Sequence, residues 1–133
     1  MKTGIICTIE RILSGIRINR LPDKAAKSVL LKDYLAVRKV AKDAEAEKRE
    51  IVTKFQSDWK EEMDDPSRRG DAFAQAEQDA EKALSEVEGR EVEISLGKVK
   101  AEALYEPDLW AEDILLAQIP GSIDFLIENG VAE

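Results

Sequence analysis

A run of more than forty residues without glycine or proline, between Pro22 and Pro66, constrains the fold more than any other feature of this chain. The residues in it are mostly good helix formers, and proline is well tolerated in the first turn of a helix. We predict one continuous helix from about Pro22 to Met63. Such a helix of about 42 residues would be about 63 Å long, because each residue adds 1.5 Å.

Apolar residues recur along this predicted helix at alternating steps of four and three, which is the rhythm of a coiled coil. Lys48 interrupts the stripe, and beyond Phe55 the steps lengthen toward the plain helical period. A long helix with so narrow a stripe needs a neighbour, since packing of the apolar face supplies most helical stability in proteins. The predicted interaction seam consists of Leu30, Tyr34, Val37, Ala41, Ala44, Ile51, Phe55 and Trp59.

The sequence MDDPSRRGD, residues 63–71, marks a turn after the long helix. Asp71 can cap a second helix from about Ala72 to Glu88, which Gly89 would end. This helix is about half as long as the first, so we predict that it folds back on residues 45–62 as an antiparallel hairpin. The remaining part of the seam then needs another cover. A second copy of the chain is the simplest candidate, and the C-terminal third is the alternative.

The stretch EVEISL, residues 91–96, alternates acidic and aliphatic side chains and therefore predicts a strand. IRINRL, residues 16–21, is the only other strand-like run, and it is basic where EVEISL is acidic. Pairing the two would place opposite charges across the strands. We predict a two-stranded ribbon, within one chain or reciprocally between two copies. Its apolar positions are Ile16, Ile18, Val92, Ile94 and Leu96.

The two ends of the chain supply further helices. Residues 3–14 form an apolar helix that Gly15 ends, and Asp108 can cap a helix over LWAEDILLAQI. Pro120 and Gly121 would then turn the chain into a last helix, SIDFLIEN, before Gly130. The C-terminal helices carry the densest apolar group of the sequence. We expect them to form a globular head with residues 3–35.

These elements predict a mainly α fold with a minor α+β component. We expect one domain over residues 1–133, in which residues 22–88 form a helical hairpin stalk. Residues 1–21 and 89–133 would form the head, which carries the short β ribbon. Aromatic residues make up only 5% of the chain, so the core must consist mainly of aliphatic side chains.

The net charge of −8 conceals a strong polarity along the chain. Residues 1–60 hold 14 basic and 8 acidic side chains, for a net +6, whereas residues 61–133 hold 6 and 20, for a net −14. The first interpretation is that the two halves fold against one another or against a neighbouring copy. The alternative is a nucleic-acid site, which Asp33, Asp43 and Glu45 would interrupt. Its cations would be Lys24, Lys27, Lys32, Arg38, Lys39 and Lys42.

Two pairs of carboxylates, Glu47-x-x-Glu50 and Glu61-x-x-Asp64, resemble the pattern of the all-helical nucleotide pyrophosphohydrolases, which bind Mg²⁺. In that family the pairs lie on two facing helices. Here both lie on one predicted helix, with Glu50 and Glu61 about 16 Å apart along its axis. A Mg-dependent pyrophosphohydrolase is therefore a distant alternative. We predict no catalytic residues, no cofactor and no metal site.

Cys7 is the only cysteine, so no disulfide can form within the chain, and the chain contains no histidine to activate its thiol. We interpret Cys7 as a small buried apolar residue. The N-terminus does not have the pattern of a signal peptide, and no stretch approaches the roughly 20 apolar residues of a membrane span. We expect a protein of a reducing aqueous compartment, without a membrane partner.

The order of LSGIRINRLPDK, a long helix with VLLKDYLAVRK and EIVTKFQSDWKEEM, then EVEISL and a leucine-rich tail resembles small uncharacterised helical proteins encoded by bacteriophages and prophages. That family has no established activity. The resemblance implies an assembly, virion-associated or structural protein in the cytoplasm of a bacterial host cell or in the virion. We predict a non-catalytic protein that acts through protein-protein interaction, as a homo-oligomer or on a phage structural protein. A host-directed binding module for protein or nucleic acid is the alternative.

Overall fold

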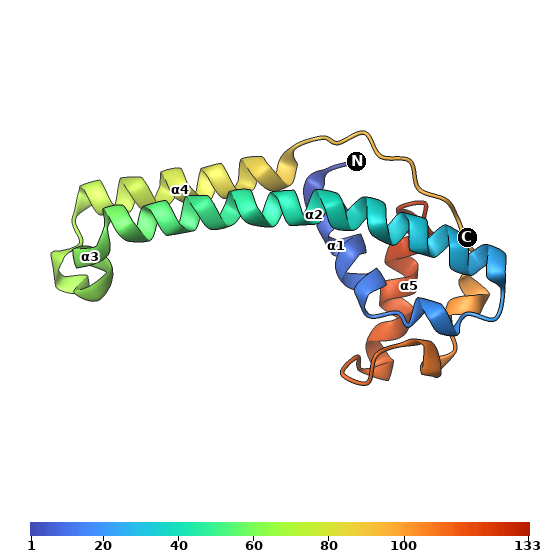
Figure 1. Ribbon diagram of the computed structural model, residues 1–133. Coiled ribbons are helices and arrows are strands. Elements are labelled where there is room, and N and C mark those ends of the chain that lie inside the picture. Colours follow the sequence, from blue (N-terminus) through green and yellow to red (C-terminus); the bar gives the residue numbers. More distant parts are fainter.

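The structure is a computed structural model that describes all residues from Met1 to Glu133, and it consists of helices and connecting segments. A hairpin of two helices projects from a head at the other end of the molecule (Figure 1). The mainly α fold and the helical hairpin are confirmed. The α-helices are α1 (Thr3–Ser14), α2 (Lys24–Asp58), α3 (Lys60–Asp64), α4 (Asp71–Gly89) and α5 (Ile119–Glu128). The 3₁₀ helices are η1 (Ile18–Arg20), η2 (Pro66–Arg68), η3 (Ala101–Leu104), η4 (Pro107–Leu109) and η5 (Leu116–Gln118).

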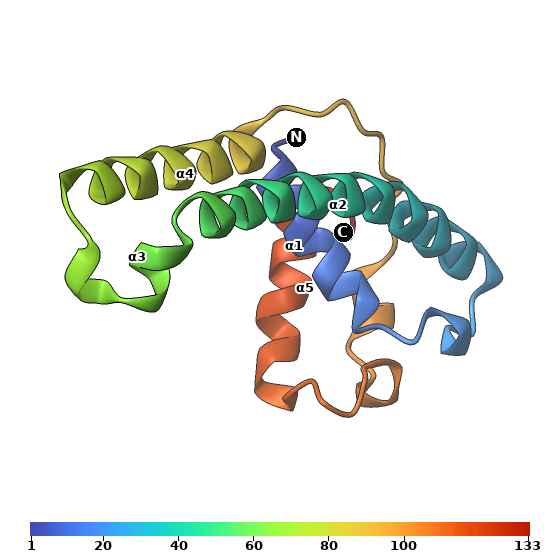
Figure 2. The same cartoon turned by 60° about the vertical axis from the view of Figure 1, so that its left-hand side comes forward.

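The longest helix, α2, runs through both parts of the molecule (Figures 1 and 2). Its start is fixed by Asp23, whose side chain accepts a hydrogen bond from the Ala25 amide at 2.9 Å. The predicted continuation to Met63 is wrong at one position, because Trp59 leaves the helical conformation with φ −121° and ψ 32°. The chain then resumes as α3. None of the helices is both long and apolar enough to cross a membrane.

The hairpin pairs the C-terminal half of α2 with α4. Lys48, which interrupts the apolar stripe of α2, forms an ion pair with Glu88. Beside it, Arg90 donates two hydrogen bonds to the Glu47 carboxylate, at 2.8 and 2.9 Å. Charged side chains thus join the two helices where the hairpin leaves the head.

The expected Asp71 cap is wrong, since Gly70 occupies the capping position of α4 without a side-chain hydrogen bond.

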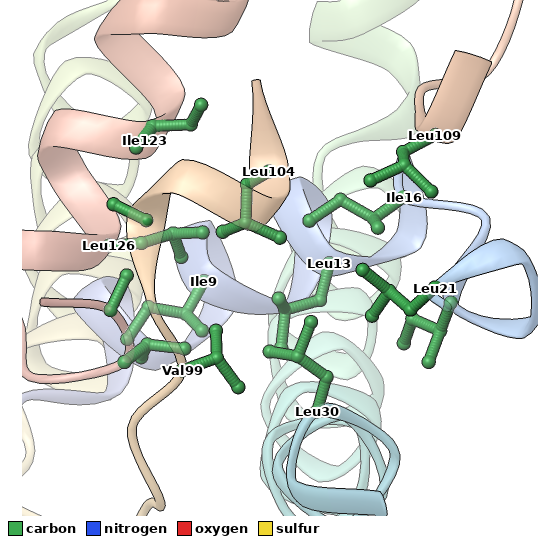
Figure 3. Packing of buried hydrophobic residues seen from close by; sticks show 14 of the residues in the cluster. Ile9, Leu13, Ile16, Leu21, Leu30, Val99, Leu104, Leu109, Ile123 and Leu126 are labelled. Atoms are coloured by element: carbon green, nitrogen blue, oxygen red, sulfur yellow. The ribbon is translucent and has the colours of Figure 1, made fainter. Parts of the chain in front are cut away.

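The hydrophobic core lies in the head, where α1 packs on the N-terminal half of α2 and α5 packs on α1 (Figure 2). Aliphatic side chains from all three helices and from the C-terminal segments interdigitate there, as the close view in Figure 3 shows. Burial of this apolar surface is the main stabilising contribution to the head. Central members of the core are Ile9, Leu13, Leu30, Leu104, Ile123 and Leu126.

The C-terminal third is less helical than the sequence predicts. No helix begins at Asp108, and residues 107–118 instead form two single 3₁₀ turns and a loop. Pro120 and Gly121 do not turn the chain, because they lie inside the first turn of α5, where proline needs no amide partner. Gly130, with φ +78°, follows the end of α5 as predicted. Because residues 107–118 do not form the predicted helix, the loop before α5 can project from the core.

The predicted two-stranded ribbon is wrong. The alternation in EVEISL does hold, since Val92, Ile94 and Leu96 pack against the core while the acidic side chains face solvent. This segment, however, contacts the N-terminus. The Thr3 amide donates to the Arg90 carbonyl at 2.9 Å, and the Val92 amide donates to the Met1 carbonyl at 2.9 Å.

The intended partner of EVEISL lies on another side of α2. Ile16 forms an isolated bridge with Trp110, and Ile18 begins η1. Residues 91–100 run along one side of α2, whereas residues 16–20 lie along another (Figures 1 and 2). The long helix therefore separates the two segments, and their complementary charges never meet.

Candidate interaction surfaces

The predicted seam is used within the chain. Leu30, Val37, Ala41 and Ala44 are buried, and Tyr34 is half-buried. The helix that packs on the N-terminal half is α1, and the segment around Gly97 also contacts this half at Val29 and Asp33. The remaining seam residues are half-buried against α4: Ile51, Phe55 and Trp59. The seam has a cover within the chain, which removes the reason for a dimer along it; self-association itself stays a prediction.

The opposite face of α2 exposes two leucines that the seam did not include. Leu31 is 45% exposed and Leu35 is 61% exposed. Residues four apart lie on the same face of a helix, so these two side chains form one small apolar surface. Leu30 and Leu31 are adjacent in sequence yet lie on the core side and the solvent side of the same turn.

Cations surround these two leucines. Between Lys24 and Lys42 the only acidic residue is Asp33, and its side chain is buried. Asp33 interrupts the basic stretch in the sequence but not at the surface of the folded protein. We call the resulting surface the basic leucine face. It consists of Leu31 and Leu35 with Lys24, Lys27, Lys32, Arg38, Lys39 and Lys42.

Asp33 is turned inward because it holds the segment that follows EVEISL. The Gly97 amide donates to its Oδ1 at 2.8 Å, while Oδ2 has no hydrogen-bond partner. Gly97 approaches the helix so closely that a β-carbon there would lie 2.7 Å from a methyl group of Val29, which explains the glycine. Burial raises the pKa of Asp33, and the Gly97 hydrogen bond lowers it in part.

This burial predicts a pH dependence of stability. The pKa of Asp33 is higher in the folded state than in the unfolded state, so the folded state loses stability as pH rises through the folded pKa and regains it as pH falls. Asp33→Asn cannot titrate and keeps an oxygen for the Gly97 amide. We expect the stability of the wild type, relative to Asp33→Asn, to improve from neutral pH to about pH 4. Urea unfolding at a series of pH values measures this, and a difference that is constant or worsens on acidification contradicts it.

A groove of about 430 Å³ borders the basic leucine face. It lies between α2 and the segment that connects α1 to η1, and we call it the α2–η1 groove. Apolar side chains such as Ile16, Leu31 and Tyr34 line it, and two cations, Arg17 and Arg20, lie among them. An apolar surface next to guanidinium groups can accept a partner that is apolar and acidic at once.

A second exposed apolar surface lies in the loop over residues 111–118, between the buried Trp110 and α5. Leu115 is 64% exposed and Leu116 is 67% exposed, so the prediction that both lie in an apolar helix of the head is wrong. Glu112 and Asp113 precede them and are also exposed. We call residues 111–118 the acidic leucine loop. In Figures 1 and 2 it projects from the head on the side away from α2.

Aromatic side chains gather at the tip of the hairpin. Phe73 is buried between Phe55, at 5.5 Å between ring centroids, and Trp59, at 5.8 Å. The guanidinium of Arg69 lies 5.0 Å from the Phe73 ring and also donates to the Glu62 carbonyl at 2.8 Å. These contacts join α2, α3 and α4, so the cluster closes the hairpin and does not form an open surface.

Two of the four carboxylates considered for Mg²⁺ are held by cations of the chain. Glu47 binds Arg90, and Glu61 pairs with Arg68 at 3.1 Å. Glu47 and Glu50 lie on α2, whereas Glu61 and Asp64 lie on α3. No three side chains of His, Cys, Asp or Glu are grouped to hold a metal ion.

Cys7 is half-buried on α1, and burial raises the pKa of its thiol. The nearby carboxylates of Glu10, Glu45 and Glu88 act in the same direction, whereas Lys48 opposes them. A raised pKa favours the neutral thiol over the reactive thiolate. This environment agrees with the interpretation of Cys7 as an apolar residue.

Comparison with protein-family models, with curated proteins and with solved structures finds no significant match to any of them.

Proposed function

We propose that this chain is a non-catalytic phage or prophage protein that acts through protein-protein interaction, in assembly or as a structural or virion-associated component. The basic leucine face and the adjoining α2–η1 groove form its docking surface. The observation that carries this proposal is the exposure of Leu31 and Leu35 among six cations, of which Arg38 is paired with Glu10. The one acidic residue of that stretch, Asp33, is turned into the core.

The chemistry of this face favours a protein partner. Covering the exposed leucines with a partner lowers the free energy, and the surrounding cations select a partner with acidic side chains. Like-charged proteins are rejected by the same cations, so the surface provides selectivity as well as affinity. The partner is therefore an apolar segment flanked by acidic residues.

Nucleic acid is the second candidate, since no exposed carboxylate interrupts the cations from Lys24 to Lys42. Phosphate binding, however, gives no role to Leu31 and Leu35, which lie among these cations. A titration with duplex and single-stranded DNA at several salt concentrations distinguishes the two. Binding that weakens steeply with salt and survives replacement of both leucines with serine favours nucleic acid.

The test uses a phage that carries the gene. Replacing Leu31 and Leu35 with serine is expected to lower the yield of infectious particles, and the amount of this protein bound to assembly intermediates, by about tenfold or more. Truncating two central interface leucines costs at least about 1.4 kcal/mol of binding, which corresponds to that factor.

Val52→Ser with Met63→Ser is the matched control, because it removes two exposed apolar side chains from the hairpin and leaves the basic leucine face unchanged. We expect this control to give the wild-type yield. If deletion of the whole gene leaves the yield unchanged, the assembly role is overturned. If the Leu31 and Leu35 variant behaves as the control does, the docking surface lies elsewhere.

A further inference from the structure

We infer that the docking surface accepts a second copy of this chain: the acidic leucine loop of one molecule binds in the α2–η1 groove of another. This inference rests on the proposed function of the basic leucine face and names its partner. Both surfaces expose leucine side chains, and their charges are opposite.

The loop has the composition that the groove selects. Its exposed leucines, Leu115 and Leu116, lie one residue beyond Glu112 and Asp113. Ile114, between the two pairs, packs toward the core, where it lies next to Gly15. One apolar side chain therefore anchors the loop, and the next two extend into solvent without a partner in their own chain.

Charge complementarity extends beyond the contact itself. Residues 101–133 contain eight acidic side chains and no basic one, whereas residues 17–42 contain eight basic and two acidic side chains. Of those two acids, Asp33 is buried, whereas Asp23, which caps the start of α2, stays exposed. Attraction between these regions of two molecules orients the loop toward the groove.

The loop does not enter the groove of its own chain. No residue after Tyr34 lines the groove, and the loop is tethered beside it. The Ala111 amide donates to the Gly15 carbonyl at 2.8 Å, and the Glu112 carboxylate lies 3.8 Å from the Arg17 guanidinium. With its base fixed there, the loop projects away from α2 (Figures 1 and 2). Each copy thus carries one groove and one loop, which two copies can exchange or several can join in series.

The test measures molecular mass by light scattering and sedimentation velocity over a concentration series at low salt. We expect the wild type to associate and added salt to weaken the association. A loop variant, Leu115→Ser with Leu116→Ser, and a groove variant, Leu31→Glu, are each expected to remain single chains. An equimolar mixture of these two variants is expected to form a two-chain complex, because one intact groove and one intact loop remain.

Far-UV circular dichroism and the thermal midpoint check that the variants fold. Should the loop variant fail to fold, Glu112→Lys with Asp113→Lys replaces it, since both side chains are exposed. Val52→Ser with Met63→Ser, which alters the hairpin only, is expected to associate as the wild type does.

The inference is overturned if the wild type stays a single chain throughout, if the loop variant associates normally, or if the mixture does not associate. A monomeric wild type together with a lower particle yield for the Leu31 and Leu35 variant would overturn the inference and keep the proposed function. Association in solution together with an unchanged yield on gene deletion would keep the inference and overturn the proposed function.

Discussion

Replacing Leu30 with alanine is expected to lower the free energy of unfolding by about 3 kcal/mol, which is within the range for a fully buried leucine. Leu30 has no exposed surface, and it lies near Leu13 and Leu21 in the core (Figure 3). The shortened side chain leaves a cavity between α1 and α2 that the packed helices cannot close. Urea unfolding followed by far-UV circular dichroism measures the loss.

Leu35→Ala is the matched control, because it makes the same chemical change on the solvent side of the same helix. Leu35 is 61% exposed, so we expect its replacement to change stability by less than about 0.5 kcal/mol. Equal losses at the two positions would mean that α2 does not present Leu30 to the core and Leu35 to solvent. The assignment of its two faces would then be wrong.

The second large effect is expected at the tip of the hairpin, where Phe73→Ala should cost about 3 kcal/mol. Phe73 is buried, and its ring contacts Phe55, Trp59 and the Arg69 guanidinium. Losing it removes both apolar burial and the aromatic contacts that join α4 to α2 and α3. Urea unfolding measures the total loss, and limited proteolysis shows whether residues 59–71 open first.

Tyr105→Ala is the control for this change, since Tyr105 is an exposed aromatic residue of the head. Its replacement is expected to leave both the unfolding midpoint and the cleavage pattern nearly unchanged. A Phe73→Ala variant as stable as Tyr105→Ala would contradict the closure of the hairpin by the aromatic cluster. Cleavage that begins in the head would contradict it as well.

The hairpin could be predicted because its signals are local. A long run without glycine or proline, a break at Pro66 and Gly70 and a shorter second helix are sufficient to define it.

The ribbon could not be predicted in the same way. Alternation in EVEISL shows which side chains are buried, but it does not name the segment that accepts the backbone hydrogen bonds. The N-terminus provides those partners, and α2 separates EVEISL from residues 16–20.

The basic leucine face was missed because each of its leucines directly follows a residue of the seam. In the pairs Leu30-Leu31 and Tyr34-Leu35, periodicity alone assigns one residue of each pair to the seam and ignores the other. The available signal was a spacing of four between two leucines outside the seam, within a run of cations. At Leu115 and Leu116 no such signal exists, since their apolar character fits a core helix equally well.

Oxidative footprinting of the wild-type protein, diluted and concentrated, reports the solvent exposure of single side chains and so shows whether the acidic leucine loop of one copy covers the α2–η1 groove of another. We expect labelling of Leu31, Leu115 and Leu116 to fall as the concentration rises, while labelling of Val52 and Met63 on the hairpin stays constant. Labelling of these three leucines that does not change with concentration would contradict this expectation, as would protection confined to the hairpin.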